Sequence, residues 1–158
     1  PDLDVNSNPM NPVIGVRSFG DDPNRAALFG AKAVEGYRNG GILCCGKHFP
    51  GHGDTAVDSH IGLPRIEKTL AQLESCELIP FRAAIGAGIP AVMSSHILFP
   101  QIEKENVPAT MSATIMRGIL RGRLGFNGLT LSDCMVMDAI RKHYGTAHGA
   151  PRRAAHVG

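Results

Sequence analysis

The chain has 158 residues, 43% of them hydrophobic, and its 16 basic residues nearly balance its 14 acidic ones. This composition is typical of a well-mixed globular protein, and it excludes a disordered tail or a fibre. The formal net charge of +2 is small and evenly spread along the sequence. Neither a nucleic-acid-binding stripe nor a membrane-surface patch is therefore expected.

No apolar run approaches the roughly 18 residues of a membrane-spanning helix. Residues 1–20 also lack the basic-then-apolar pattern of a signal peptide. The sequence begins at Pro1 without an initiator methionine, so we expect the protein's own start to lie upstream.

The four cysteines form no C-x-x-C pair, and we interpret them as reduced, mostly buried thiols. They are Cys44, Cys45, Cys76 and Cys134. Reduced thiols favour the cytoplasm as the location, with an exported form as the alternative.

Four short apolar runs predict β-strands that are buried on both faces. They span residues 3–6, 42–48, 91–96 and 129–133. Each run ends in polar residues, which are Asp4 and Asn6, Lys47 and His48, Ser95 and His96, and Asp133. Longer helical patterns alternate with these runs, which indicates successive β/α units around a parallel sheet.

Three helical patterns lie between the predicted strands. The first spans residues 23–39, begins after two aspartates and ends at a Gly-Gly pair. The second begins with a capping box of Thr69 and Gln72 and is expected to continue as one helix that bends at Pro80. The third follows Ser112, a candidate cap, carries an apolar stripe and stops at a glycine.

Polar residues at the ends of apolar parallel strands are typical of (β/α)8 barrels, which build their active sites there. The predicted fold is therefore α/β, a partial (β/α)8 TIM-type barrel of about four β/α units. A complete barrel needs roughly 250 residues, so the chain corresponds to about half of one. An open doubly wound sheet is the alternative, but no G-x-G-x-x-G or P-loop fingerprint follows a predicted strand.

Residues 47–60 concentrate three histidines, two aspartates and a lysine. Pro50 and the neighbouring glycines prevent a helix here, so the segment is a predicted loop beyond a strand end. His52 and the Asp-Thr pair that follows it are equally well explained as residues that rigidify this loop. Asp58 and His60 differ, because an Asp-x-His pair lets a carboxylate hold an imidazole in one tautomer, as in a catalytic dyad.

Several motifs of the chain together resemble one known family. They are LDVN (3–6), NPVIGVRSF (11–19), KHFPGHGDT (47–55), DSH (58–60) and FNGLTLSD (126–133). This set is similar to glycoside hydrolase family 3, and specifically to its β-N-acetylhexosaminidase branch. The Asp-Ser-His element indicates the branch, because the β-glucosidase relatives lack it. The resemblance implies hydrolysis of terminal β-linked N-acetylglucosamine, typically derived from peptidoglycan turnover, without a cofactor or a metal.

The resemblance also implies catalytic roles. Asp133 is expected to be the nucleophile, and His60, oriented by Asp58, the general acid/base. A retaining glycosidase needs a nucleophilic carboxylate about 5 Å from a proton donor and passes through a covalent glycosyl intermediate. Histidine suits the second role, since its ordinary pKa of roughly 6.5 lies near working pH.

Substrate-binding roles are implied in the same way. Lys47 and His48 match family positions that bind sugar hydroxyls, and Arg17 matches the arginine that contacts the N-acetylated sugar. His96 matches a position near the site, where donation to a backbone carbonyl is as good an explanation as substrate contact. The expected partner is a small carbohydrate or a muropeptide.

The resemblance covers residues 1–145, which we interpret as a fragment of the catalytic barrel. Residues 146–158 have no recognisable match and are expected to be a disordered or truncated tail. The family barrel begins before residue 1 and supplies there a sugar-binding aspartate that this chain lacks. Since the remaining part of the barrel is required, we predict that residues 1–158 alone have little or no activity and aggregate, dimerise or remain partly unfolded.

Two other classes of function remain as alternatives. The first is a metal-dependent barrel hydrolase that uses His48, His52, His60 and Asp133 as ligands. The second is a non-catalytic carbohydrate-binding remnant of the fold. The intact dyad and nucleophile argue against the second, because binding alone requires neither.

Overall fold

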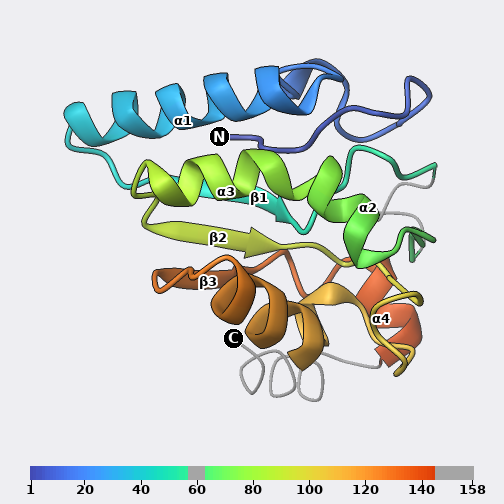
Figure 1. Cartoon of the computed structure of the whole chain (residues 1–158). Helices are drawn as coiled ribbons and strands as arrows, with labels where there is room; N and C mark the ends of the chain where they lie inside the picture. The colour runs from blue at the N-terminus through green and yellow to red at the C-terminus, as the bar shows by residue number, and fades with distance from the viewer. Residues whose placement is uncertain (57–62, 145–158) are drawn as a thin grey trace.

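The computed structural model describes residues 1–56 and 63–144, and it contains a three-stranded parallel sheet with helices packed around it (Figure 1). The strands are β1 (Cys45–Phe49), β2 (Ala91–Ser94) and β3 (Leu129–Ser132). The longer helices are α1 (Pro23–Asn39), α2 (Leu70–Ser75), α3 (Leu78–Gly86), η3 (Thr114–Arg123) and α4 (Asp138–Tyr144). Two short 3-10 turns complete the set, η1 (Gly15–Arg17) and η2 (Ala109–Met111).

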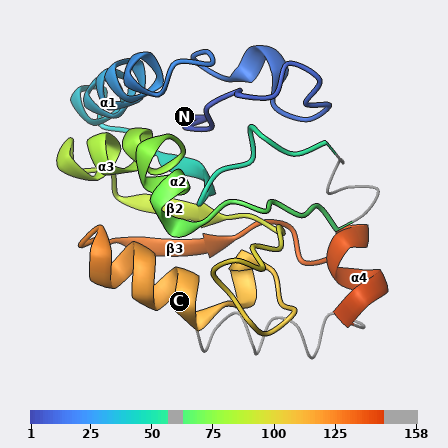
Figure 2. The same cartoon turned by 45° about the vertical axis from the view of Figure 1, so that its right-hand side comes forward.

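The sheet has the order β1-β2-β3, and both strand pairs are parallel. Helices α2 and α3 connect β1 to β2, and η2 and η3 connect β2 to β3, so each connection is a helical crossover. The three strands end at the same edge of the sheet, on the side where α4 lies (Figures 1 and 2). The predicted α/β architecture, a part of a barrel built from β/α units, is confirmed.

The N-terminal residues lie beside β1 but do not form the predicted strand over residues 3–6. Asp2 makes one isolated parallel bridge to Lys47, and the Leu3 backbone N–H donates to the Lys47 carbonyl at 2.7 Å. Beyond Leu3 the ladder stops, because the Asp4 N–H is bonded to the Asp2 side chain and the Asn6 N–H to Gly20. The prediction of a fourth strand is wrong for this reason.

The start of β1 also differs from the prediction. Residues 42–44 precede the strand, because Gly41 adopts a left-handed φ of 70° and the Ile42 N–H still bonds to the Tyr37 carbonyl of α1. The chain therefore leaves the helix through a turn and joins the sheet only at Cys45. This turn leaves Ile42 58% and Leu43 87% exposed.

Local capping signals are confirmed at two helices. Asp22 caps α1, since its carboxylate accepts hydrogen bonds from the backbone N–H groups of Asn24 and Arg25. At α2, Thr69 and Gln72 form the predicted reciprocal capping box. These contacts are local in sequence, which is why the sequence predicts them correctly.

The second helical pattern is two helices rather than one bent helix. Helix α2 ends at Ser75 and α3 begins at Leu78, so the break lies at Cys76 and Glu77. Pro80 is the third residue of α3, where a missing N–H breaks no intrahelical hydrogen bond. Proline therefore sits in the first turn of a new helix, and the predicted bend at Pro80 is wrong.

Helix η3 follows the predicted cap and stop. The Ser112 hydroxyl accepts a hydrogen bond from the Ile115 N–H, and Gly125 adopts a left-handed φ of 70° after the helix. The helix has π character, as the Leu124 N–H bonds to the Ile119 carbonyl five residues earlier. Its apolar stripe is buried, which confirms core packing.

The main core lies between the sheet and the helices. Its largest fully buried side chains are Phe49, Phe81, Phe99, Leu3, Leu73, Leu78, Ile97, Ile115 and Leu120. Strand β3 departs from the prediction of burial on both faces, because three of its four residues are exposed, including Leu129 at 62%. Among the described residues β3 pairs only with β2, so its outer edge has no strand against it.

The cysteines are all free, as predicted, but only Cys44 is buried. Cys45 and Cys76 are half-buried and Cys134 is exposed, so the prediction of mostly buried thiols is wrong. The helices of the described segments are all too short or too polar to cross a bilayer.

Candidate active site

Polar residues from all three strands meet at the edge where the strands end. His48 is the fourth residue of β1, Ser95 and His96 follow β2, and Asp133 follows β3. The parallel ladder continues past the strand ends, since the Ser95 N–H bonds to the Phe49 carbonyl and the Asp133 N–H to the Ser94 carbonyl. This edge corresponds to the active-site face of a barrel.

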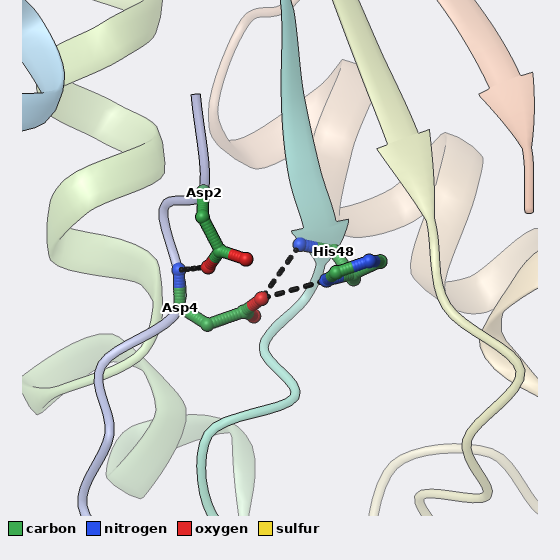
Figure 3. Close-up of side chains that lie close together, drawn as sticks. All are labelled: Asp2, Asp4 and His48. Carbon is green, nitrogen blue, oxygen red and sulfur yellow. Dashed lines mark hydrogen bonds and ion pairs between the residues drawn. The ribbon is translucent and has the colours of Figure 1, made fainter. Parts of the chain in front are cut away.

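The buried carboxylate of Asp4 organises two histidines at this edge, and Figure 3 shows it with the first of them, His48. Its Oδ2 accepts from His48 twice, from the backbone N–H at 3.1 Å and from ring Nδ1 at 2.7 Å. Its Oδ1 accepts from the His52 backbone N–H at 2.6 Å. A carboxylate with three such donors fixes the end of β1 and the start of the following loop together.

The bond to Asp4 sets the tautomer of His48. A carboxylate can only accept, so Nδ1 carries the hydrogen, and Nε2 is left as the acceptor of the neutral ring. Burial lowers the pKa of His48 to about 4, against the opposing negative charges of Asp2 and Asp133. His48 is therefore neutral at pH 7 and offers a lone pair to a hydroxyl donor.

Asp2 adds a second buried carboxyl group to the pair. Its Oδ1 accepts from the Asp4 N–H, and its Oδ2 makes no hydrogen bond but lies 3.9 Å from Arg17 Nη1. Burial and, to a smaller extent, the neighbouring charge of Asp4 together raise the pKa of Asp2 to about 7. Burial also raises the pKa of Asp4. Asp2 is therefore only partly ionised at pH 7.

A metal ion fits this cluster poorly. Within residues 1–56 and 63–144, one group has ligand atoms close enough together to hold a metal ion. It consists of Asp2, Asp4 and His48, whose ligand atoms lie within 4.8 Å of one another. However, both Asp4 oxygens already accept protein hydrogen bonds, and His48 Nδ1 is committed as a donor. A cation here would have to displace these bonds and would also face the Arg17 guanidinium.

The loop after β1 is anchored on the N-terminal segment. The Asn11 side-chain amide donates to the carbonyls of His52 and Thr55, at 2.8 and 3.0 Å. His52 Nδ1 lies 2.8 Å from the Thr55 hydroxyl. Gly53 packs so closely on Val5 that a Cβ there would lie 1.8 Å from the Val5 carbonyl oxygen. The rigidifying interpretation of His52 and Thr55 is thus confirmed by these bonds.

His96 contacts the backbone that follows β3. Its Nε2 lies 3.1 Å from the Cys134 carbonyl oxygen, which can only accept, so Nε2 carries the hydrogen. Its Nδ1 lies 2.9 Å from the Thr110 hydroxyl. Both ring nitrogens are therefore bonded within the protein, next to Asp133. The predicted contact of His96 with substrate stays a prediction.

Asp133 itself is half-buried at the strand end. One oxygen, Oδ1, accepts from the Cys134 backbone N–H at 2.7 Å, which orients the carboxylate. Burial lowers the pKa of His96 and of His52, so the histidines around Asp133 are neutral at pH 7. The histidines near Asp133 thus contribute polar but uncharged groups.

The remaining predicted site residues are distributed as follows. Lys47 lies in β1 beside His48, with its backbone bonded to the N-terminal segment and its side chain half-buried. Arg17 ends η1, is exposed, and donates from Nη2 to the Val13 carbonyl. Asp58 and His60 lie outside the described residues, as do residues 146–158 of the predicted tail.

Sequence reasoning missed the importance of Asp4 and Asn11. The sequence places Asp4 at the end of a predicted strand and Asn11 in a motif of the resemblance, while each anchors the loop after β1, more than 40 positions away. An acidic residue inside an apolar run was the available signal, because a buried carboxylate requires hydrogen-bond donors.

Comparison with known proteins identifies the same family as the motifs of the sequence. The whole chain, residues 1–158, matches the Glycosyl hydrolase family 3 N terminal domain. β-Hexosaminidase A of Pseudoalteromonas piscicida is 42% identical over 151 residues, covering 89% of this chain and 25% of that protein. Curated relatives are covered over 25–43% of their own lengths, so the chain spans less than half of them.

Similar solved structures support the same family. A family 3 β-N-acetylglucosaminidase from Paenibacillus sp. str. FPU-7 is 47% identical and superposes with a TM-score of 0.97 over 100% of this chain and 30% of its own. NagZ of Neisseria gonorrhoeae, solved with N-trifluoroacetyl-D-glucosamine, is 36% identical with a TM-score of 0.84, over 100% of this chain and 44% of its own. With the family match extending over every residue, the resemblance is confirmed, and the chain belongs to glycoside hydrolase family 3 as part of its N-terminal domain.

Proposed function

We propose that this chain carries the catalytic groups of an enzyme that hydrolyses terminal β-linked N-acetylglucosamine. One observation supports the proposal above the others: Asp133, directly after β3, lies at the same edge of the sheet as His48 near the end of β1. The relatives are named β-hexosaminidases and β-N-acetylglucosaminidases, which is consistent with that substrate class. Peptidoglycan-derived glycosides are the proposed natural substrates.

The proposed mechanism is a double displacement with retention of configuration. The Asp133 carboxylate attacks the anomeric carbon while His60 protonates the leaving oxygen, which yields a glycosyl-aspartate ester. His60 then removes a proton from water, the water oxygen attacks the anomeric carbon, and Asp133 departs. Asp58 holds the His60 ring and stabilises its protonated form.

The sugar would be held by groups around the nucleophile. Neutral His48, with Nδ1 bonded to Asp4, would accept a hydrogen bond from a sugar hydroxyl at Nε2. Lys47 and Arg17 would supply cationic donors to the hydroxyls and the N-acetyl group. The complete site needs the rest of the barrel, so residues 1–158 alone are proposed to be inactive.

The test uses the protein expressed at its full encoded length. It is incubated with 4-nitrophenyl N-acetyl-β-glucosaminide and, in parallel, with the matching β-glucoside. We expect nitrophenol release from the first substrate only. Asp133→Asn should lower kcat by about 10³-fold, because it removes the nucleophile but keeps the shape of the side chain.

Two controls make the result specific. Asp21→Asn, at an exposed aspartate before α1, should leave the rate unchanged. EDTA should also leave it unchanged, whereas loss of activity that zinc restores would favour the metal-dependent alternative. Release that survives Asp133→Asn would exclude Asp133 as the nucleophile.

A further inference from the structure

Asp2 carries a buried carboxyl oxygen without a hydrogen bond. Its side chain is 5% exposed, and Oδ1 accepts from the Asp4 N–H at 3.2 Å, while Oδ2 finds no donor among the described residues. Buried polar atoms are nearly always bonded, so an oxygen of this kind needs an explanation. Burial of an incompletely bonded carboxylate costs stability, so packing of the protein interior does not explain an acid at this position.

The unbonded oxygen faces the guanidinium group of Arg17. Asp2 Oδ2 lies 3.9 Å from Arg17 Nη1, and Arg17 is the one arginine or lysine of the described residues within 4.0 Å of this carboxylate. The other terminal nitrogen, Nη2, donates to the Val13 carbonyl at 2.7 Å. The guanidinium is therefore held from two directions, by a carbonyl of its own loop and by a buried acid. Its planar, forked set of donors suits such a double attachment.

Both side chains belong to the strand-end cluster. The ligand atoms of Asp2, Asp4 and His48 lie within 4.8 Å of one another, and Figure 3 shows the two carboxyl groups on the same side of the N-terminal segment, towards β1. The charge of Arg17 lowers the pKa of His48, and that of Asp133 raises it. The Arg17 side chain is 42% exposed, in contrast to that of Asp2. A sugar at the strand ends can therefore contact the guanidinium but not the buried Asp2 oxygen.

We propose that Asp2 positions Arg17 for binding of the N-acetylated sugar. The inference rests on the proposed function, in which Arg17 donates to the sugar. It assigns Asp2 as a positioning residue, which touches neither the sugar nor the reacting atoms. The ion pair restricts a long, flexible side chain before the sugar arrives, so less conformational entropy is lost on binding. Loss of the pair should weaken sugar affinity and leave the chemical step unchanged.

The experiment measures sugar binding and turnover separately in the full-length protein. Hydrolysis of 4-nitrophenyl N-acetyl-β-glucosaminide is followed at pH 8, where Asp2, with its pKa of about 7, is mostly ionised. Asp2→Asn keeps an acceptor for the Asp4 N–H but removes the negative charge that faces Arg17. We expect KM and the inhibition constant of free N-acetylglucosamine to rise about fivefold, with kcat changed less than about twofold.

A double-mutant cycle tests whether Asp2 acts through Arg17. Arg17→Met removes the guanidinium group and should raise KM at least as much as Asp2→Asn does. In the Arg17→Met background, Asp2→Asn should have no further effect on KM, because the group that it positions is gone. Asp21→Asn, at an exposed aspartate, is the matched control and should change neither KM nor kcat.

Stability provides a readout that separates positioning from damage to the fold. Asp2→Asn removes an incompletely bonded buried charge, so its melting temperature at pH 8 should be higher than that of the unaltered protein. A variant that is more stable and yet binds the sugar more weakly has lost a functional contact rather than its structure.

The outcomes for the inference and for the proposed function differ. An unchanged KM in Asp2→Asn, a loss confined to kcat, or an equal loss in the Arg17→Met background would overturn the positioning role. Nitrophenol release by the unaltered protein would still support the proposed function in each of these cases. An unaltered full-length protein that releases no nitrophenol would overturn the proposed function, and this inference with it.

Discussion

Asp2 and Asp4 are two positions apart, yet their buried carboxyl groups have different surroundings. Asp4 accepts hydrogen bonds from His48 in β1 and from His52 in the loop after it, 44 and 48 positions away. Asp2 receives one backbone hydrogen bond and a distant guanidinium. Burial destabilises the ionised form of Asp2 and the nearby charge of Asp4 adds to this, which is why its pKa is raised to about 7.

This difference predicts a pH-dependent stability. The pKa of Asp2 is about 7 in the folded chain and 3.8 in its unperturbed form, so the folded state holds an extra proton between these values. Raising the pH through that window therefore lowers the free energy of unfolding. Asp2→Asn, which keeps the acceptor for the Asp4 N–H, should stabilise the protein by about 2 kcal/mol at pH 8 and by nearly nothing at pH 4.

The measurement is chemical denaturation of the unaltered protein and of the Asp2→Asn variant at pH 4, 6 and 8. Asp21→Asn provides the control, because this aspartate is exposed and its substitution should shift stability equally at each pH. A stabilisation by Asp2→Asn that does not grow with pH would contradict the raised pKa.

At the scale of elements, the sequence correctly predicts helix ends that depend on contacts between residues close together in the chain. The Asp22 cap, the Thr69–Gln72 capping box and the glycine after η3 all act within one or two turns of chain, and all are where the sequence places them. The break between α2 and α3 was missed, because it depends on Glu77 reaching a lysine and a glycine of other segments. An acid within an apolar stripe was the available signal for that break.

In the candidate site too, features set by local sequence were predicted and contacts between distant residues were not. The strand-end positions of Lys47, His48, His96 and Asp133 follow from apolar runs and their polar ends. What each side chain touches could not be predicted, since His48 depends on Asp4 and His96 on the Cys134 carbonyl, both distant in sequence. Contacts of this kind form only when the sheet assembles.

The loop after β1 depends on the absence of a side chain at Gly53. A Cβ there would lie 1.8 Å from the Val5 carbonyl oxygen, and neither backbone can move without breaking bonds to Asp4 or Asn11. Gly53→Ala should therefore lower the free energy of unfolding by about 3 kcal/mol and reduce kcat/KM of the full-length protein.

Gly36→Ala is the matched control. Gly36 lies in α1 with open space around its Cβ position and a right-handed conformation, so alanine should stabilise the protein by about 0.5–1 kcal/mol. Thermal denaturation and steady-state kinetics of both variants make the comparison. A Gly53→Ala protein as stable as the Gly36→Ala one would show that the loop adjusts without cost.

At the scale of the molecule, helices flank the strands of the described chain, but the outer edge of β3 has no strand paired with it. Helices α1, α3 and η3 flank the strands in Figure 1, and the main core lies between them. Strand β3 presents an outer edge without a partner among the described residues, with Leu129 62% and Leu131 37% exposed. Unpaired edges with apolar side chains are templates for association with other chains.

The open edge predicts how residues 1–158 behave when produced by themselves. We expect concentration-dependent self-association in analytical ultracentrifugation, because pairing at β3 buries Leu129 and satisfies free backbone groups. Leu129→Lys should weaken the association by about tenfold, since a charged side chain on an edge strand opposes pairing. Val16→Lys serves as the control, because Val16 is fully exposed on η1, away from the edge. A monomer at all concentrations, or equal effects of the two lysines, would mean that the edge of β3 is not the contact.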